Sequence, residues 1–240
     1  GHVGLGETFF GPRAVAGCVH EMFAPMLIGK DPLAIERHWR DMFDMANAFG
    51  YAGAEARAIS AIDIALWDIS GQVAGQPIYN LLGGMVHEKL RSYTYLYPAP
   101  ESETKDVLSV ADAFGDPALT PERAAHYVEQ GFTAVKFDPV MPMSAFDSRQ
   151  LSLEALENAE LVTGNVRDAV GSKCDLLIGT HGQMTTSSAI RLAKRLEQFD
   201  PLWFEEPVPP ENTSEMARVA RSTSIPVASG ERLTTKYEFV

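Results

Sequence analysis

The chain has 240 residues, of which 45% are hydrophobic and 22% charged, an ordinary composition for a globular protein that buries a core. Its net charge of −12, without any cluster of Lys and Arg, argues against binding to nucleic acid or to an anionic membrane surface. No apolar run reaches the roughly 18–20 residues needed to cross a bilayer, and Cys18 and Cys174 form neither a disulfide framework nor a zinc motif, so we expect a cytoplasmic protein.

The first third of the chain, from about residue 13 to residue 91, is predicted to be helical. Within residues 55–80, apolar side chains recur at the i, i+3 and i+4 positions that share one face of a helix. Gly75 and Pro77 then interrupt this pattern, so we expect a second, short helix that ends at Gly83.

From residue 91 onward, short apolar segments alternate with helical ones. Five of them are predicted strands, at residues 92–97, 134–138, 176–179, 202–206 and 226–231. The segments between them are predicted helices, at residues 120–130, 151–170, 187–199 and 213–221. This alternation predicts parallel β/α units. Five strands would complete a doubly wound sheet but only part of a (β/α)8 barrel, which takes about 250 residues.

Ionisable side chains stand at the carboxyl end of four consecutive predicted strands. They are Lys136 and Asp138, then His181, then Glu205, and finally Glu231. Burying charge at the end of an apolar strand is costly unless the charge is paired or coordinated. Scattered surface charges would not repeat with the strand period, and in a barrel this end of the strands holds the active site. We therefore expect these residues to be functional.

The residue types suit chemistry on a carboxylate substrate. Glu205 and Glu231 would supply the oxygen ligands that Mg²⁺ prefers. Lys136 beside them would act as a base or stabilise negative charge. A divalent cation that binds the substrate carboxylate stabilises the enediolate that forms when the α-proton leaves.

These motifs resemble those of the enolase superfamily, in its mandelate racemase and muconate lactonizing branch, and are closest to its acid-sugar, galactonate-type dehydratases. The likeness covers nearly the whole chain. GLGE at residues 4–7 resembles the edge of the family's capping domain, and residues 60–84 resemble its first barrel helix region. VKFD, WFEEP and SGE resemble the motifs of its second, fourth and fifth strands.

The resemblance implies a domain organisation. Residues 1–91 would be the end of an α+β capping domain and the helical region that leads into the barrel. Residues 92–240 would form strands one to five of a (β/α)8-type TIM barrel. The family's later strands, and the beginning of its capping domain, are expected to lie outside this sequence, and we expect the given piece not to fold or act alone.

The resemblance also implies a role for each matching residue. Lys136 matches the catalytic lysine of the second strand. His181 matches a histidine that, in galactonate-dehydratase-like members, helps the departing hydroxyl leave. Glu205 and Glu231, which are 26 residues apart as in the family, match two of its three metal ligands.

The third ligand position falls on Gly179, where the family usually has an aspartate. Glycine has no side chain to bind a metal. Because side chains alternate along a strand, Asp138 shares a face with Lys136 and is expected to supply the missing oxygen ligand. His181 and Gln183 are the alternatives.

The second-strand motif is Lys-x-Asp where the family has Lys-x-Lys, and an aspartate cannot replace the second lysine as a base. We therefore predict a Mg²⁺-dependent lyase that dehydrates an aldonate or aldarate through α-proton abstraction and an enediolate. The alternatives are a racemase or epimerase on the same scaffold and, because of Gly179, a non-catalytic sugar-acid-binding member. The expected partners are a small carboxylate substrate and further copies of the chain in a homo-oligomer.

Overall fold

The structure is a computed structural model that describes residues 1–50, 52–97, 115–141 and 148–239. It divides into two compact units, Gly1–Leu90 with Leu233–Val240, and Arg91–Arg232. The division falls after Leu90, and the last eight residues group with the first unit. No helix in the described part of the chain is long and apolar enough to span a membrane.

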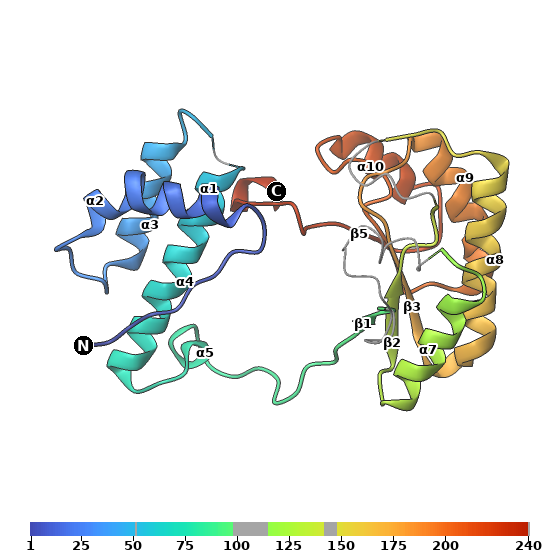
Figure 1. Cartoon of the computed structure of the whole chain (residues 1–240), viewed down its shortest axis with the longest axis horizontal. Helices are drawn as coiled ribbons and strands as arrows, with labels where there is room; N and C mark the ends of the chain where they lie inside the picture. The colour runs from blue at the N-terminus through green and yellow to red at the C-terminus, as the bar shows by residue number, and fades with distance from the viewer. Residues whose placement is uncertain (51, 98–114, 142–147, 240) are drawn as a thin grey trace. The chain divides into compact units, whose positions relative to one another are not determined.

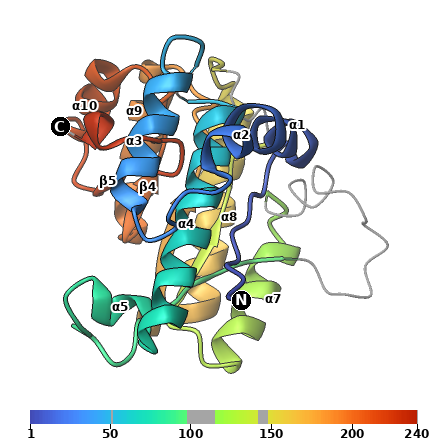
Figure 2. The ribbon, with the colours of Figure 1, turned by 90° about the vertical axis from the view of Figure 1, so that its left-hand side faces the viewer.

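The first unit is helical. Its elements are α1 (Pro12–Gly17), the π-helical turn η1 (Cys18–Phe23), α2 (Ala24–Leu27), α3 (Ile35–Ala46), α4 (Ala54–Ala74), α5 (Ile78–Leu81) and the 3₁₀ turn η4 (Lys236–Phe239). α3 lies alongside α4 (Figure 2). Gly75, in the left-handed conformation, ends α4, and Pro77 precedes α5, which confirms the predicted break between the two helices.

The second unit is a sheet of five strands, β1 (Thr94–Tyr95), β2 (Ala134–Phe137), β3 (Asp175–Gly179), β4 (Trp203–Glu205) and β5 (Val227–Ala228). All neighbouring strands are parallel, and their order in the sheet, β1-β2-β3-β4-β5, follows the sequence. A doubly wound sheet reverses its order at a switch point, and this sheet does not. The predicted α/β class is therefore confirmed, with the strand order of consecutive barrel strands.

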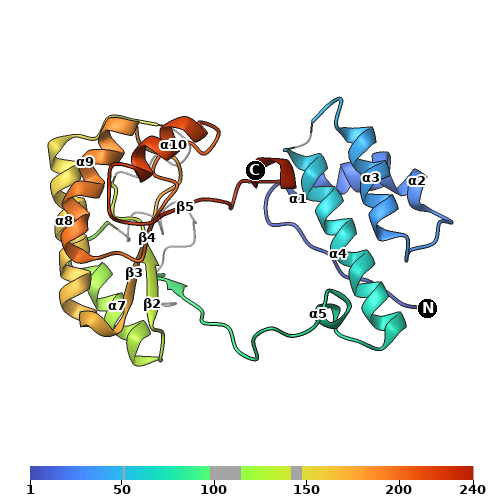
Figure 3. The ribbon, with the colours of Figure 1, turned by 180° about the vertical axis from the view of Figure 1, so that it is seen from behind.

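In the described part of this unit, four helices follow the strands, α7 (Leu119–Glu129), α8 (Leu153–Val170), α9 (Thr186–Leu196) and α10 (Thr213–Ala220), with 3₁₀ turns η2 (Gly171–Lys173) and η3 (Glu197–Phe199). α7, α8 and α9 lie along one face of the sheet (Figures 1 and 3). Ser152, Thr185 and Asn212 cap the N-termini of α8, α9 and α10 with their side-chain oxygens.

The start of α7 differs from the prediction. The sequence predicts a helix from residue 120, whereas α7 begins at Leu119, so Thr120 is buried inside its first turn. The carboxylate of Asp116 accepts the backbone N–H groups of Ala118 and Leu119, at 2.8 and 2.9 Å. These two hydrogen bonds lower the pKa of Asp116 and give partners to two backbone N–H groups at the start of α7.

The two faces of the sheet have different chemistry. The face toward the helices is apolar and completely buried, with Val135, Phe137, Leu176, Ile178 and Phe204. The strand register aligns Tyr95 with Lys136, Lys136 with Leu177, and Leu177 with Trp203. Since side chains alternate along each strand, the opposite face carries these aligned residues together with Gly179 and Glu205.

Candidate active site at the carboxyl ends of the strands

Lys136 and Glu205 form a buried ion pair on this second face. The side chain of Lys136 passes over Gly179 of β3, and its Nζ donates to Glu205 Oε1 of β4 at 2.6 Å. Only 5% and 11% of the two side chains are exposed. Trp203 Nε1 donates to the other carboxylate oxygen, Oε2, at 3.1 Å. Burial of this charge pair is tolerated because both carboxylate oxygens have a hydrogen-bond donor.

Aromatic rings surround the ammonium group. Lys136 Nζ lies 5.0 Å from the ring centroid of Tyr95 and 5.8 Å from that of Tyr93, within cation–π range. The Tyr93 ring packs edge-on against Trp203 at 5.5 Å. A Cβ atom added at Gly179 would collide with Lys136 Cε and lie 2.8 Å from the Tyr95 hydroxyl oxygen. The space beside Gly179 is thus filled by the ends of two neighbouring side chains.

Asp138 follows β2 and is completely buried. Gln183 Nε2 donates to both of its carboxylate oxygens, at 3.0 and 2.8 Å, and the backbone N–H of Val140 donates to Oδ1 at 3.0 Å. His181 Nδ1 lies 3.7 Å from Oδ2. Burial raises the pKa of Asp138, while these partners oppose the rise.

His181 depends on that carboxylate. Asp138 raises the pKa of His181, although burial of the imidazole acts in the opposite direction. A raised pKa favours the protonated imidazolium at neutral pH, which is the form that donates a proton. The pair is therefore suited to general acid catalysis, with Asp138 as the group that favours the protonated form of His181.

The end of β4 is fixed by a separate set of contacts. Thr180 Oγ1 donates to the backbone carbonyls of Glu205 and Glu206, at 2.6 and 3.0 Å. Glu206 adopts a left-handed backbone conformation, with φ of 38°, and its buried carboxylate accepts from Arg232 Nε at 3.2 Å. A positive φ is unusual for a residue other than glycine, so these contacts hold β4 in a strained but defined geometry.

Glu231 lies in the turn after β5 and is exposed. The strand ends at Ala228, so the predicted strand at residues 226–231 is too long. Glu231 follows the last residue of β5 by three positions, at the carboxyl end of the sheet, and its negative charge contributes to the raised pKa values of Tyr95, His181 and Glu206.

Sequence reasoning identified the charged members of the site and missed the aromatic ones. Tyr93, Tyr95 and Trp203 contact Lys136 or Glu205 but carry no charge to mark them. The alternation of side chains along a strand could have identified them. Tyr95 is aligned with Lys136 on the neighbouring strand, Tyr93 is two residues before Tyr95, and Trp203 is two residues before Glu205.

The described residues do not fit a magnesium site with three carboxylate ligands. Among them, no group of three His, Cys, Asp or Glu side chains is arranged to hold a metal ion. The oxygens of Glu205 and Asp138 accept hydrogen bonds from protein donors, and Gly179 has no side chain to supply a ligand. Asp138, Glu205 and Glu231 are thus not brought together as a metal site.

Comparison with known proteins identifies the family. Residues 1–83 match the family described as mandelate racemase/muconate lactonizing enzyme, N-terminal domain, and residues 120–240 match the family described as enolase C-terminal domain-like. The chain belongs to the mandelate racemase/muconate lactonizing enzyme family of the enolase superfamily. This membership confirms the resemblance inferred from the sequence motifs.

Similar proteins include sugar-acid dehydratases. The chain is 34% identical to a D-galactonate dehydratase of Xanthomonas oryzae pv. oryzae, over 100% of this chain and 57% of the relative. It is 32% identical to a D-xylonate dehydratase of Haloferax volcanii, over 99% of this chain and 55% of the relative. A crystal structure of a mandelate racemase/muconate lactonizing enzyme from Jannaschia sp. CCS1 is 39% identical, with a TM-score of 0.88, over 100% of this chain and 61% of that one. The chain therefore spans less than two thirds of these relatives.

Proposed function

We propose that the protein containing this chain is a hydro-lyase that dehydrates a sugar acid, an aldonate or an aldarate. The observation that carries the proposal is the concentration of Lys136, Asp138, Glu205 and His181 at the carboxyl ends of three consecutive strands, with all but His181 almost fully buried. Perturbed, buried ionisable groups cluster at functional sites. The similarity to proteins named as D-galactonate and D-xylonate dehydratases supports the class of substrate.

The proposed reaction begins with loss of the α-proton of the sugar acid, which leaves an enediolate. The ammonium of Lys136 supplies positive charge that stabilises this intermediate, and its pair with Glu205 and the rings of Tyr93 and Tyr95 hold the ammonium in place. We assign the acceptor of the α-proton to a barrel strand that this chain does not include.

The second step breaks the bond between the β-carbon and its hydroxyl. His181 donates a proton to the hydroxyl oxygen, so that the group leaves as water, and the electron pair of the enediolate forms the new carbon–carbon double bond. The resulting enol tautomerises to a 2-keto-3-deoxy acid. Asp138 keeps His181 protonated for this step.

The Mg²⁺ dependence that the sequence predicts is not part of this proposal. Enolase-superfamily enzymes with a Lys or His base use Mg²⁺, but the described side chains do not fit such a site. The steps above use only side chains of the protein. The predicted homo-oligomer stays a prediction.

The test is a screen of the full-length protein against a library of aldonates and aldarates, with detection of 2-keto acids as semicarbazones. We expect a 2-keto-3-deoxy product from at least one sugar acid, and its loss in His181→Asn. No such product from any sugar acid would refute the proposal. The same screen in D₂O separates the alternatives, because a racemase or epimerase exchanges the α-proton without releasing water, and a non-catalytic binder does neither.

A further inference from the structure

The buried carboxylates at this end of the sheet already have positive partners. Lys136 pairs with Glu205 at 2.6 Å and Arg232 with Glu206 at 3.2 Å, and the imidazole of His181 lies 3.7 Å from Asp138. Charges are buried at acceptable cost when they are paired in this way. A divalent cation entering among them would meet the Lys136 ammonium as a like charge, unless that side chain moved away.

Gly179 is the reason that Lys136 can reach Glu205. It lies between them in the sheet, since β3 separates β2 from β4 and Gly179 is aligned with Glu205. Any residue with a Cβ would collide there with Lys136 Cε and approach the Tyr95 hydroxyl oxygen to 2.8 Å. An aspartate at position 179 is therefore incompatible with the observed path of the lysine side chain.

The surroundings of the ammonium suit an organic cation better than Mg²⁺. Mg²⁺ requires near-octahedral oxygen ligands and keeps several of its waters. The faces of Tyr93 and Tyr95 offer π-electron density, which attracts an ammonium group, and Trp203 occupies the second oxygen of Glu205. One carboxylate oxygen and two aromatic rings do not provide the oxygen ligands of a Mg²⁺ coordination shell.

We propose that the ammonium of Lys136 takes the place of the divalent cation that related enzymes hold at these strands, and that Gly179 makes room for it. Two consequences follow. The protein binds divalent cations weakly, and replacing Gly179 by Asp both adds an oxygen ligand and forces Lys136 away from Glu205. The inference concerns cation binding and stands whether or not the substrate is a sugar acid.

The experiment is a titration of the metal-stripped full-length protein with Mn²⁺, in which bound and free Mn²⁺ are separated by electron paramagnetic resonance. Gly179→Asp is compared with wild type and with Gly179→Asn, which has nearly the same size and displaces Lys136 equally but lacks the charge. We expect the Asp variant alone to bind one Mn²⁺ at least about tenfold more tightly than wild type, because affinity rises with the number of charged oxygen ligands. Adding Glu205→Gln to the Asp variant should abolish this gain.

A wild-type protein that binds one Mn²⁺ per chain with micromolar affinity, lost in Glu205→Gln, would overturn the proposal. A folded Asp variant that binds no more tightly than wild type would overturn it as well. The Tyr95 hydroxyl is the remaining obstacle to a side chain at position 179. If Gly179→Asp fails to fold, the variant Tyr95→Phe with Gly179→Asp removes that obstacle and is titrated in its place.

Discussion

The two ends of the parallel sheet in the unit Arg91–Arg232 hold their charged side chains differently. At the carboxyl end, Lys136 and Glu205 are paired with only 5% and 11% of their side chains exposed. At the amino end, Arg91 pairs with Asp175 at 2.7 Å, with 51% and 41% exposed. Burial gives the first pair a large desolvation penalty, whereas exposed pairs of the second kind lose little hydration and add little to stability.

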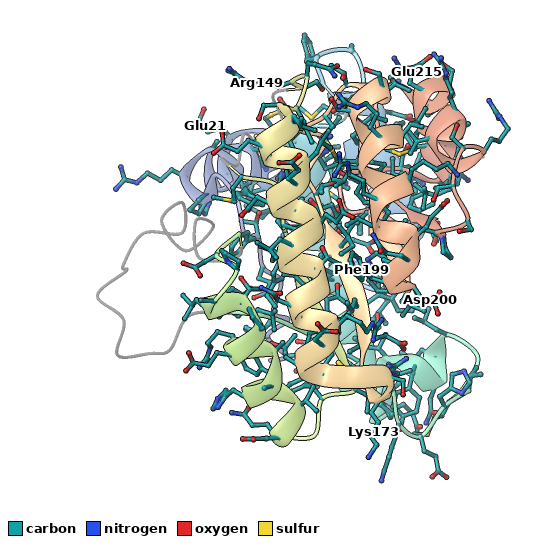
Figure 4. All side chains as sticks on the ribbon, turned by 90° about the vertical axis from the view of Figure 1, so that its right-hand side faces the viewer. Glu21, Arg149, Lys173, Phe199, Asp200 and Glu215 are labelled. Carbon is teal, nitrogen blue, oxygen red and sulfur yellow. The ribbon has the colours of Figure 1, made fainter. Side chains whose placement is uncertain are left out.

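Contacts at the amino end join helices and loops to the sheet. Arg167 of α8 donates to four backbone carbonyls, those of Gly171, Cys174, Phe199 and Asp200. Figure 4 shows Lys173, Phe199 and Asp200 at this end of α8 and α9, and Arg149 and Glu215 at the other. In β/α barrels the amino-terminal end of the strands serves stability and the carboxyl-terminal end serves activity. Variants at each end should therefore change different measurable properties.

The largest effect is expected for Lys136→Met. It leaves Glu205 buried without a cation, which costs about 3–5 kcal/mol of stability, and it removes the charge proposed to stabilise the enediolate, which lowers kcat by at least about a hundredfold. The matched control, Lys136→Met with Glu205→Gln, has no unpaired charge. It should regain most of the stability and none of the activity. If urea unfolding gives Lys136→Met the same free energy of unfolding as wild type, Lys136 does not stabilise the buried charge of Glu205.

His181→Asn should lower kcat by about 10²–10⁴-fold, because a general acid contributes a factor of this size. A second substrate tests proton donation by His181 specifically. A substrate analogue with fluoride in place of the departing hydroxyl needs less protonation, so it should lose much less rate in the variant. A loss of the same size with both substrates would show that His181 does not act as the acid.

Asp138→Asn tests the pairing with His181 through pH. As a general acid, His181 must be protonated, so kcat falls as the pH rises through its pKa. Asp138 raises that pKa, and removing its charge should move the falling limb of the kcat–pH profile to lower pH, with a loss of about 10–100-fold near neutrality. Asp168→Asn removes the same charge from an exposed position of α8 and should leave the limb in place. If the falling limb does not move in Asp138→Asn, Asp138 does not set the pKa of His181.

These carboxyl-end residues also show what a sequence reveals and what it does not. Period-two alternation and strand–helix spacing predicted the five strands and placed Lys136 and Glu205 at one end of the sheet, because both patterns are local. The partner of Asp138 was not predictable in this way. The sequence suggested a metal ligand, but the side chain of Gln183, which is 45 residues away, occupies both of its oxygens.

The path of the Lys136 side chain was equally hidden. The sequence marked Gly179 as a missing ligand, yet an absent side chain says nothing of what fills its space. That depends on the alignment of β1, β2, β3 and β4, which brings Tyr95, Lys136 and Glu205 around the glycine. The hydrophobic pattern of a strand fixes which face is buried, but which residues of two strands lie side by side also depends on the packing of segments that are tens of residues apart in the sequence.

At the amino end, Arg167→Ala should reduce stability by about 2–3 kcal/mol and leave kcat unchanged. Four hydrogen bonds from a charged donor are lost, and the carbonyls of the loops before β3 and β4 lose their common partner. Arg191→Ala, which removes an exposed arginine of α9, is the control and should stay close to wild type. A fall in kcat for folded Arg167→Ala would show that the two ends of the sheet are not separate in function.

The smallest effect is expected for Glu197→Gln, which separates exposed charge from buried charge by its pH dependence. The backbone N–H of Ser224, with Lys194 and Thr223, lowers the pKa of Glu197 from 4.5 to about 2. Because the folded-state pKa is lowered, the stabilisation is complete above pH 4.5 and disappears as the pH falls toward about 2.

The variant should melt about 1–2 °C below wild type at pH 7, and the difference should shrink below pH 4.5. Glu157→Gln, at an exposed position of α8, should show no such pH-dependent difference. A gap in Tm that stays constant with pH would mean that the side-chain shape, and not the charge of Glu197, joins η3 to the segment before β5.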